Sequence, residues 1–106
     1  MRERAKKDAE RGRLAAAMAA SALGTSLDEV LNGHRGMKVM FTRQVALYLA
    51  AAGFGMSYGR AAAAFGCDPS TVAHACRVIE AKRDEPAFDH WLDKLEAAAV
   101  NSPVLS

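Results

Sequence analysis

Apolar residues recur every three or four positions along most of the chain, the spacing that places side chains on one face of a helix. The clearest case lies between Lys38 and Ala52, where one buried stripe of a predicted central helix is formed by Phe41, Val45, Tyr48, Leu49 and Ala52. No segment alternates between apolar and polar residues as a half-buried strand would. The pattern predicts an all-α fold, a compact domain of about five to six helices.

Glycine and capping residues mark the ends of the outer helices. Gly24 ends an alanine-rich first helix, because glycine adopts the left-handed cap conformation at little cost. Ser26 and Glu29 have the spacing of a capping box, so a short helix is expected to follow through Leu31. The last helix is expected to run from near residue 86 to residue 100.

Two further predicted helices meet at a tight corner and form a candidate helix-turn-helix. Ser57 caps the first helix, and Gly66 ends it. Asp68 caps the second helix, with Pro69 in its first turn, where the missing amide proton costs nothing. Alanines at 61–64 allow the close approach that a perpendicular pair around a short turn requires.

The second of these helices has a packing side and an outward side when its residues are placed at about 100° intervals. The packing side comprises Val72, Ala75, Cys76 and Ile79. The outward side, spread over roughly 60°, comprises Ser70, His74, Arg77 and Ala81. Short polar groups near the helix start suit base-edge hydrogen bonds, and a guanidinium two turns later suits a phosphate. An ordinary helical hairpin with a solvated outer face fits the same pattern, so the spacing alone leaves both interpretations open.

The larger apolar residues must supply the core, since alanine fills little volume although it raises the apolar content to 51%. A chain of 106 residues can enclose one modest core. We expect a charged lead-in over residues 1–13, one domain over 14–100 and a loose end over 101–106. The predicted core residues are Leu14, Met18, Leu31, Phe41, Val45, Leu49, Phe65, Val72, Ile79, Phe88, Trp91 and Leu95.

Charge is distributed unevenly along the chain. Residues 1–83 carry 13 Lys and Arg against 7 Asp and Glu, a net +6, whereas residues 84–106 carry 1 against 5, a net −4. A basic body attracts polyanions through counterion release, and an acidic end can limit indiscriminate binding. A solvated surface of no special function gives the same asymmetry.

Several function classes are unsupported by the sequence. No apolar run approaches the roughly 20 residues that span a bilayer, so we expect no membrane partner and a cytoplasmic protein. His34, His74 and His90 do not pair with a nucleophile at a recognisable spacing, and no glycine loop cradles a phosphate, so we expect neither an enzyme nor a cofactor. Cys67, His74 and Cys76 lack a fourth metal ligand, and Cys76 is better explained as a buried apolar residue.

The run from Thr42-Arg43-Gln44 through Phe65-Gly66 to residues 70–80 resembles the carboxy-terminal DNA-binding domain of the bacterial replication initiator DnaA. The most specific part is Thr71-Val72 followed by His74-Ala75 and Ile79, and a weaker similarity extends from about residue 14 to residue 98. Stand-alone copies of such a domain resemble small bacterial or phage-derived regulators, including the amino-terminal part of gene transfer agent activators.

The resemblance implies a recognition helix in the major groove of duplex DNA and a basic loop in the adjacent minor groove. Arg35 matches the arginine of the minor groove. The other residues expected to contact bases are Asp68, Ser70, Thr71 and His74. Those expected to contact the DNA backbone are Lys38, Arg43, Arg60 and Arg77.

The departures from the family pattern predict a different target site. Pro69 stands where the family usually has a base-reading histidine, Val78 replaces a basic residue, and the turn is one residue shorter. No phosphate-binding loop is present, so this sequence does not by itself switch with ATP or load a helicase.

We therefore expect a sequence-specific double-stranded DNA-binding protein that acts as a transcription regulator. RNA polymerase or another transcription factor is the expected second partner. The alternative is a protein-interaction adaptor that keeps the fold without binding DNA and docks through its acidic last helix or its charged amino terminus.

Overall fold

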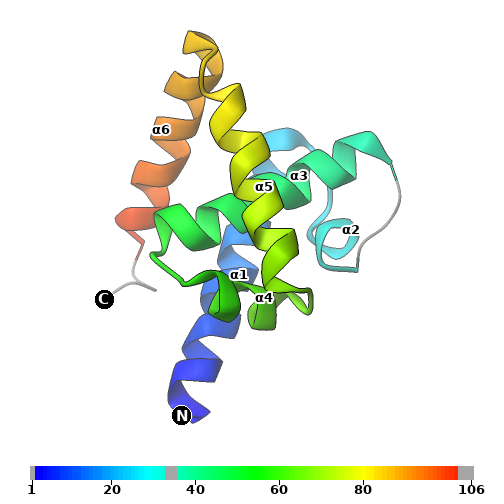
Figure 1. Ribbon diagram of the computed structural model, residues 1–106, viewed down its shortest axis with the longest axis vertical. Helices are drawn as coiled ribbons and strands as arrows, with labels where there is room; N and C mark the ends of the chain where they lie inside the picture. Colours follow the sequence, from blue (N-terminus) through cyan, green and yellow to red (C-terminus); the bar gives the residue numbers. More distant parts are fainter. Residues whose placement is uncertain (1, 33–35, 103–106) are drawn as a thin grey trace.

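A computed structural model describes residues 2–32 and 36–102 of the chain. Figure 1 shows a bundle built from α1 (Arg2–Leu23), α2 (Leu27–Asn32), α3 (Met37–Tyr48), α4 (Tyr58–Phe65), α5 (Pro69–Lys82) and α6 (Pro86–Val100). A short π-helical segment, η1 (Leu49–Gly53), continues α3. No strand occurs over these ranges, so the predicted all-α fold is confirmed.

The helix ends follow the chemistry that the sequence predicts. Ser26 and Glu29 form a reciprocal capping box, in which each side chain accepts a hydrogen bond from the other residue's backbone N–H, at 3.1 and 3.2 Å. Ser57 Oγ accepts from the backbone N–H of Arg60 at 3.2 Å and caps α4. Gly24 and Gly66 both adopt the left-handed conformation, with φ of 73° and 68°.

The start of α5 differs in one detail from its prediction. Asp68 occupies the cap position, and Pro69 begins the helix, but the Asp68 side chain makes no capping hydrogen bond. The backbone carbonyl of Asp68 accepts from Thr71 N–H at 2.9 Å instead. Asp68 is exposed, so its carboxylate oxygens stay available to accept hydrogen bonds from outside the helix.

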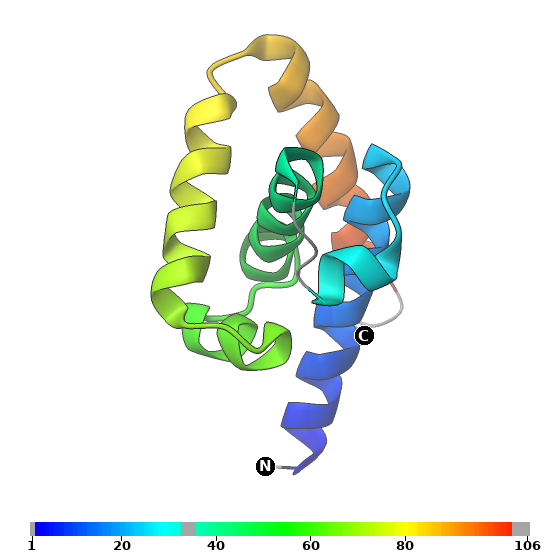
Figure 2. The same ribbon diagram turned by 90° about the vertical axis from the view of Figure 1, so that its right-hand side faces the viewer.

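The core is built around α3 and η1. Every residue from Val45 to Ala50 is buried, so this stretch is enclosed on all sides rather than along the single stripe that its spacing predicts. The first turn of α3 is exposed at Met37, Lys38 and Met40, and Ala52 of the predicted stripe is exposed as well. Figure 2 shows α3 end-on between α5 on one side and α1 on the other. Four buried alanines of α1, at positions 15, 16, 19 and 20, allow α1 to lie close to it.

The predicted core residues divide into two groups. Val45, Leu49, Phe65, Val72 and Ile79 are buried, whereas the other seven are half-buried residues that pack around the edge of the core. Tyr48 and Leu92, which the spacing placed on the apolar sides of their helices, are buried as well. Four other large buried residues were not predicted, because they lie off the simplest helical stripes or between helices: Val30, Leu47, Phe54 and Met56.

One arginine ties the acidic helix α6 to the end of α5. Arg83 Nε donates to Asp89 at 2.5 Å, and its Nη1 donates to Glu96 at 2.7 Å and to the Tyr48 hydroxyl at 2.9 Å. Asp93 also pairs with this guanidinium. Hydrogen bonds to these groups, chiefly Asp89, raise the pKa of Arg83 above its ordinary value, so the cation is fully retained.

Aromatic side chains fill the space between α3 and α6. Phe41 of α3 lies 6.1 Å from Phe88 of α6, and Phe88 lies 5.5 Å from Trp91, measured between ring centroids. The Lys82 ammonium lies 5.5 and 5.6 Å from the Phe41 and Phe88 ring centroids. The ring planes are tilted by 51° and 36°, and these separations fit aromatic contacts and cation–π attraction that hold α6 against α3 and the end of α5.

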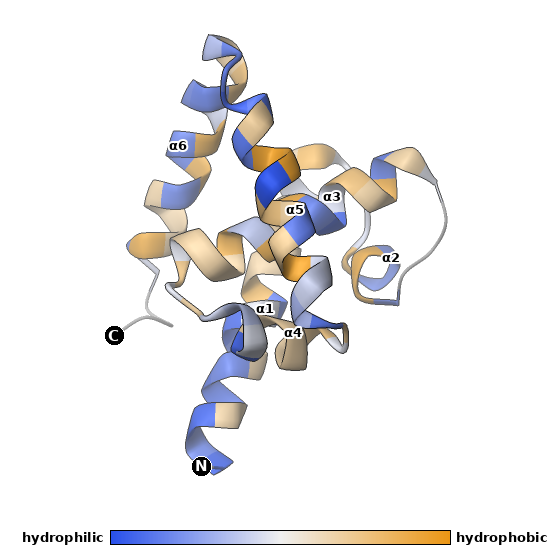
Figure 3. Ribbon diagram, in the orientation of Figure 1, coloured by the Kyte–Doolittle hydropathy of each residue, from blue (hydrophilic) through white to orange (hydrophobic). Residues whose placement is uncertain are grey.

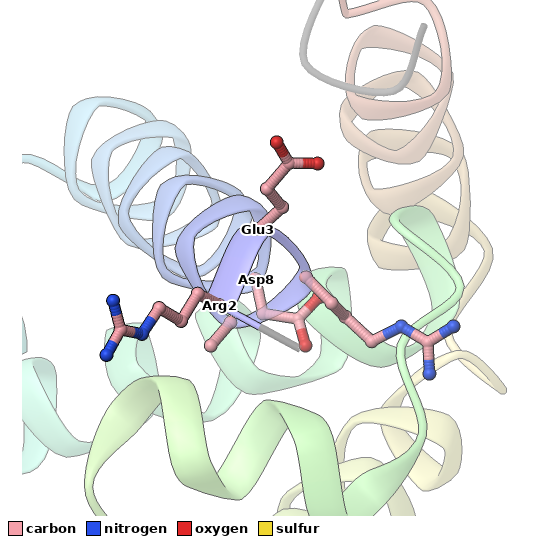
Figure 4. Close-up of a pocket in the computed structure, with 5 residues that line it drawn as sticks. Arg2, Glu3 and Asp8 are labelled. Atoms are coloured by element: carbon pink, nitrogen blue, oxygen red, sulfur yellow. The ribbon is translucent and has the colours of Figure 1, made fainter.

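The charged first turns of α1 are part of the folded body. Asp8 is 7% exposed and accepts two hydrogen bonds from Arg60 of α4, at 2.6 and 2.9 Å, and one from Arg11 at 3.3 Å. Figure 4 shows Asp8 directed toward the body of the protein, whereas Arg2 and Glu3 project away from it. The helix thus continues through residue 13, the expected end of the lead-in, and its earlier turns already pack on α4.

Replacing Asp8 with asparagine tests this contact. Arg60 holds the pKa of Asp8 below its ordinary range, although burial acts in the opposite sense. Because the folded-state pKa is the lower one, the ion pair stabilises fully above the unfolded-state value of about 3.9, and the stabilisation is lost as the pH falls through the folded value. We expect Asp8→Asn to lower the free energy of unfolding by about 1–2 kcal/mol at pH 7.

Urea unfolding at pH 7 and at pH 3 measures this effect. The difference between wild type and Asp8→Asn should shrink at the lower pH. The exposed Glu10→Gln, also on α1, serves as the control and should change little. An equal loss for Asp8→Asn at both pH values would show that the carboxylate charge is not what stabilises α1 on α4.

Candidate nucleic-acid interface

A short helix and a longer one meet at a corner closed by backbone hydrogen bonds. The chain reverses at Gly66, and Cys67 N–H donates to the Ala62 carbonyl at 2.9 Å, one turn back in α4. Ala61 and Ala62 are buried, which lets α4 lie against the rest of the bundle. In Figure 2, α5 rises from this corner along one edge of the molecule. The α4–turn–α5 unit is a helix-turn-helix.

The two sides of α5 separate as the sequence predicts. Val72, Ala75, Cys76 and Ile79 face the core and are at most 3% exposed. The exposed side comprises Ser70, Thr71, His74, Arg77 and Ala81. Figure 3 shows hydrophilic and hydrophobic residues alternating along α5, consistent with these two sides. We call Asp68, Ser70, Thr71, His74 and Arg77 the α5 stripe; all five are exposed and free to meet an external partner.

Arg43 has internal hydrogen-bond acceptors. Its Nη1 donates to the Val30 carbonyl of α2 at 2.7 Å, and its Nη2 donates to the Phe65 carbonyl at the end of α4 at 3.2 Å. The guanidinium also lies 5.8 Å from the centroid of the Phe65 ring. The side chain therefore joins the end of α2 to the corner of the helix-turn-helix, and a phosphate would compete with these acceptors for both terminal nitrogens.

The other expected backbone contacts lie in different settings. Arg77 is on the α5 stripe, and Lys38 is exposed at the start of α3, between the exposed Met37 and Met40. Arg60 is partly exposed, but its guanidinium is bonded to Asp8. Arg35, the expected minor-groove residue, lies outside the described residues. Apart from Arg35, the base-reading candidates lie together at the start and on the exposed side of α5, and their DNA contacts stay predictions.

Within the described ranges, no group of three or more His, Cys, Asp or Glu residues could hold a metal ion. Cys76 is buried and Cys67 half-buried, and burial raises the pKa of both thiols. None of the helices described is long and apolar enough to cross a membrane.

One group of basic residues on α1 was not predicted to contribute to a site. Arg4, Lys7 and Arg11 line a recess beside Arg60, at the junction of α1 with α4. Their spacing of three and four residues places them on one side of a helix, which was the available signal. They were overlooked because residues 1–13 were treated as a lead-in without a packed partner.

Comparisons with known proteins agree with this geometry. A family model described as the bacterial dnaA protein helix-turn-helix matches residues 16–79. The crystal structure of a DNA replication initiation factor is similar to this fold, with a TM-score of 0.80 and 25% sequence identity. The similarity covers 91% of this chain and 30% of the initiation factor, so the chain corresponds to less than a third of that protein's length. No curated protein sequence matches the chain.

Removing the Arg43 side chain tests its place at the corner. Hydrogen bonds from a charged donor contribute about 1.5–3 kcal/mol, so we expect Arg43→Ala to lower the free energy of unfolding by about that amount. Arg43→Lys should recover only part of the loss, because one ammonium cannot span the two carbonyls as a planar guanidinium does.

Denaturant unfolding measures the stability, and duplex titration over a range of salt concentrations measures any phosphate contact. If the stability of Arg43→Ala equals that of the wild type, the conclusion that Arg43 stabilises the fold by joining α2 to the helix-turn-helix corner is wrong. A fall of about 1 in the salt slope would show that Arg43 also meets a phosphate.

Proposed function

We propose that this chain, which belongs to the bacterial dnaA protein helix-turn-helix family, binds double-stranded DNA at a specific sequence and regulates transcription. In this proposal, α5 lies in the major groove, and RNA polymerase or another transcription factor is the second partner. The protein would act in the cytoplasm, at the nucleoid. The initiation factor's role in replication is a property of that longer protein.

The observation that carries the proposal is the α5 stripe. Its side chains are exposed, and the opposite side of α5 is buried in the core. Their positions relative to the bundle are therefore fixed before any partner binds. A recognition helix contacts bases mainly through the residues of its amino-terminal turns. Asp68, Ser70 and Thr71 occupy those turns, and His74 follows one turn later. Arg77 is placed to reach the flanking backbone.

Two side chains complete the proposed interface. Arg35 would enter the minor groove next to the α5 site, where narrow A·T-rich segments attract arginine. Lys38, exposed at the start of α3, would contact the backbone between the two grooves. Because Pro69 offers no side-chain donor or acceptor, the base-reading set starts from Asp68 and continues at Ser70.

The adaptor alternative receives less support from the structure. It relies on the acidic α6 or on the charged amino terminus as a docking surface. However, Asp89, Asp93 and Glu96 are paired with Arg83 and are therefore partly neutralised within the protein. The charged amino-terminal residues are part of α1, where Asp8 is paired with Arg60 and Arg11. The exposed α5 stripe has no equivalent internal partners among the described residues that would explain its polarity.

Selection of binding sites from a random duplex library tests the function directly. We expect the wild type to yield a defined motif and to bind it with a steep salt dependence. Ser70→Ala should change the preferred base at one position, and Arg77→Ala should weaken binding to all duplexes and lower the salt slope by about 1. Ser21→Ala and Lys94→Ala, both exposed and off the stripe, are the matched controls. Absence of any enriched motif would favour the adaptor.

The minor-groove residue has a separate test. We expect Arg35→Ala to cost about 1–3 kcal/mol of binding free energy on the selected site, because the arginine would make a specific contact there. Fluorescence anisotropy on the selected duplex, and on a duplex whose flanking A·T pairs are replaced by G·C, measures the cost. The cost should be smaller on the second duplex. Unchanged affinity on the first duplex would remove Arg35 from the interface.

A further inference from the structure

A cationic recess lies where α1 meets the start of α4. Its volume is about 350 Å³, and its lining consists of Glu3, Arg4, Lys7, Arg11 and Arg60. Four of these five residues are basic, and they come from two helices that are far apart in the sequence. Arg4, Lys7 and Arg11 share one side of α1, at spacings of three and four residues.

The acids near the recess do not balance these cations. Asp8 accepts hydrogen bonds from Arg60 and from Arg11, and Glu3 is the one acid of the lining itself. Arg4 and Lys7 are exposed, and no salt bridge joins either to an acid in the described part of the chain. The Nε of Arg11 is buried and lacks a hydrogen-bond acceptor among the described residues. The recess is therefore short of negative charge and of acceptor atoms.

The position of the recess indicates which anion would fill it. In helix-turn-helix complexes the second helix lies in the major groove, and the first helix crosses the DNA backbone. Here α4 is the first helix, and Arg60 belongs to its first turn, beside the cap residue Ser57. A backbone that passes the start of α4 would meet the α1 cations next.

We propose that Arg4, Lys7, Arg11 and Arg60 bind a phosphate of the DNA backbone beside the site read by α5, so that α1 lengthens the DNA footprint. The inference rests on the proposed function, because it assumes that the duplex lies against α4 and α5. A phosphate oxygen seated in the recess supplies the acceptor that Arg4 and Lys7 lack within the protein. Asp8 keeps Arg60 and Arg11 in place without neutralising the whole group.

The chain offers a matched control on the same helix. Lys6 and Arg13 are seven residues apart on another side of α1, where they line a different hollow together with Leu31 and Ala64. All four of Arg4, Lys7, Lys6 and Arg13 are exposed. The double variants Arg4→Gln/Lys7→Gln and Lys6→Gln/Arg13→Gln therefore remove the same charge from the same helix and should both fold, which circular dichroism verifies.

Affinity for a selected duplex and for an unrelated duplex is measured between about 50 and 200 mM salt. Each phosphate interaction that a variant removes should reduce the weakening over that range by about threefold. We expect Arg4→Gln/Lys7→Gln to show this reduction on both duplexes, with an unchanged preference between them. Hydroxyl-radical footprinting should show a protected segment shortened at one end. Lys6→Gln/Arg13→Gln should keep the wild-type salt slope and footprint.

The possible results distinguish a failure of the phosphate site on α1 from a failure of the proposed DNA-binding function. Equal salt slopes and footprints for the two double variants would show that α1 acts only through net charge and would overturn the phosphate site, while DNA binding would stand. A wild type that binds no duplex at any salt concentration would remove both proposals. A changed sequence preference in Arg4→Gln/Lys7→Gln would also overturn the backbone assignment, because phosphate contacts carry no base information.

Discussion

The enclosure of residues 45–50, where α3 continues into η1, is the constraint on which the rest of the structure depends. Because every residue from Val45 to Ala50 is buried, the helices around this segment have little freedom in how they pack. The alanines of α1 bring that helix close on one side, and the inner side of α5 covers another. Val72 and Ile79 are completely buried in this contact, so α5 cannot rotate without exposing them. The direction of the α5 stripe is thus a consequence of core packing.

A second consequence concerns the arginines. Counting charges along the chain treats all basic residues as equally available to an anion, but four arginines of the described residues, Arg11 beside Asp8 among them, have partners within the protein. Arg43 joins two backbone carbonyls, Arg60 holds Asp8, and Arg83 gathers the acids of α6. Most of the basic charge that remains exposed in the described residues lies on α1, and the rest is carried by Lys38, Arg77, Lys82 and Lys94. The negative charge available at the acidic end of the chain is reduced in the same way, since Arg83 pairs with three of its carboxylates.

Local chemistry made much of this fold predictable. The capping box at Ser26, the cap at Ser57 and the left-handed Gly66 depend on residues close in sequence, so spacing was enough to locate them. The division of α5 into two sides followed from helical periodicity in the same way. Contacts between distant residues were not predictable. Asp8 and Arg60 are 52 residues apart, and a charged residue near a chain end gives no local sign that it will be buried. The full enclosure of residues 45–50 was also not predicted, because periodicity assigns one buried stripe and cannot show a segment surrounded by neighbours.

The start of α5 shows how such local details affect recognition. An aspartate at a helix cap normally uses its carboxylate to accept backbone N–H groups. Here the Asp68 carboxylate makes no such bond, and Pro69 removes one of the N–H groups that would need it. The carboxylate remains exposed at the positive end of the helix dipole, where negative charge is favoured. Within the proposed complex it would act as an acceptor for a cytosine amino group, with the hydroxyls of Ser70 and Thr71 beside it. Because of Pro69, the recognition helix lacks one side chain that could hydrogen-bond to a base. The neighbouring Asp68 carboxylate, which is not used to cap the helix, can make such a contact instead.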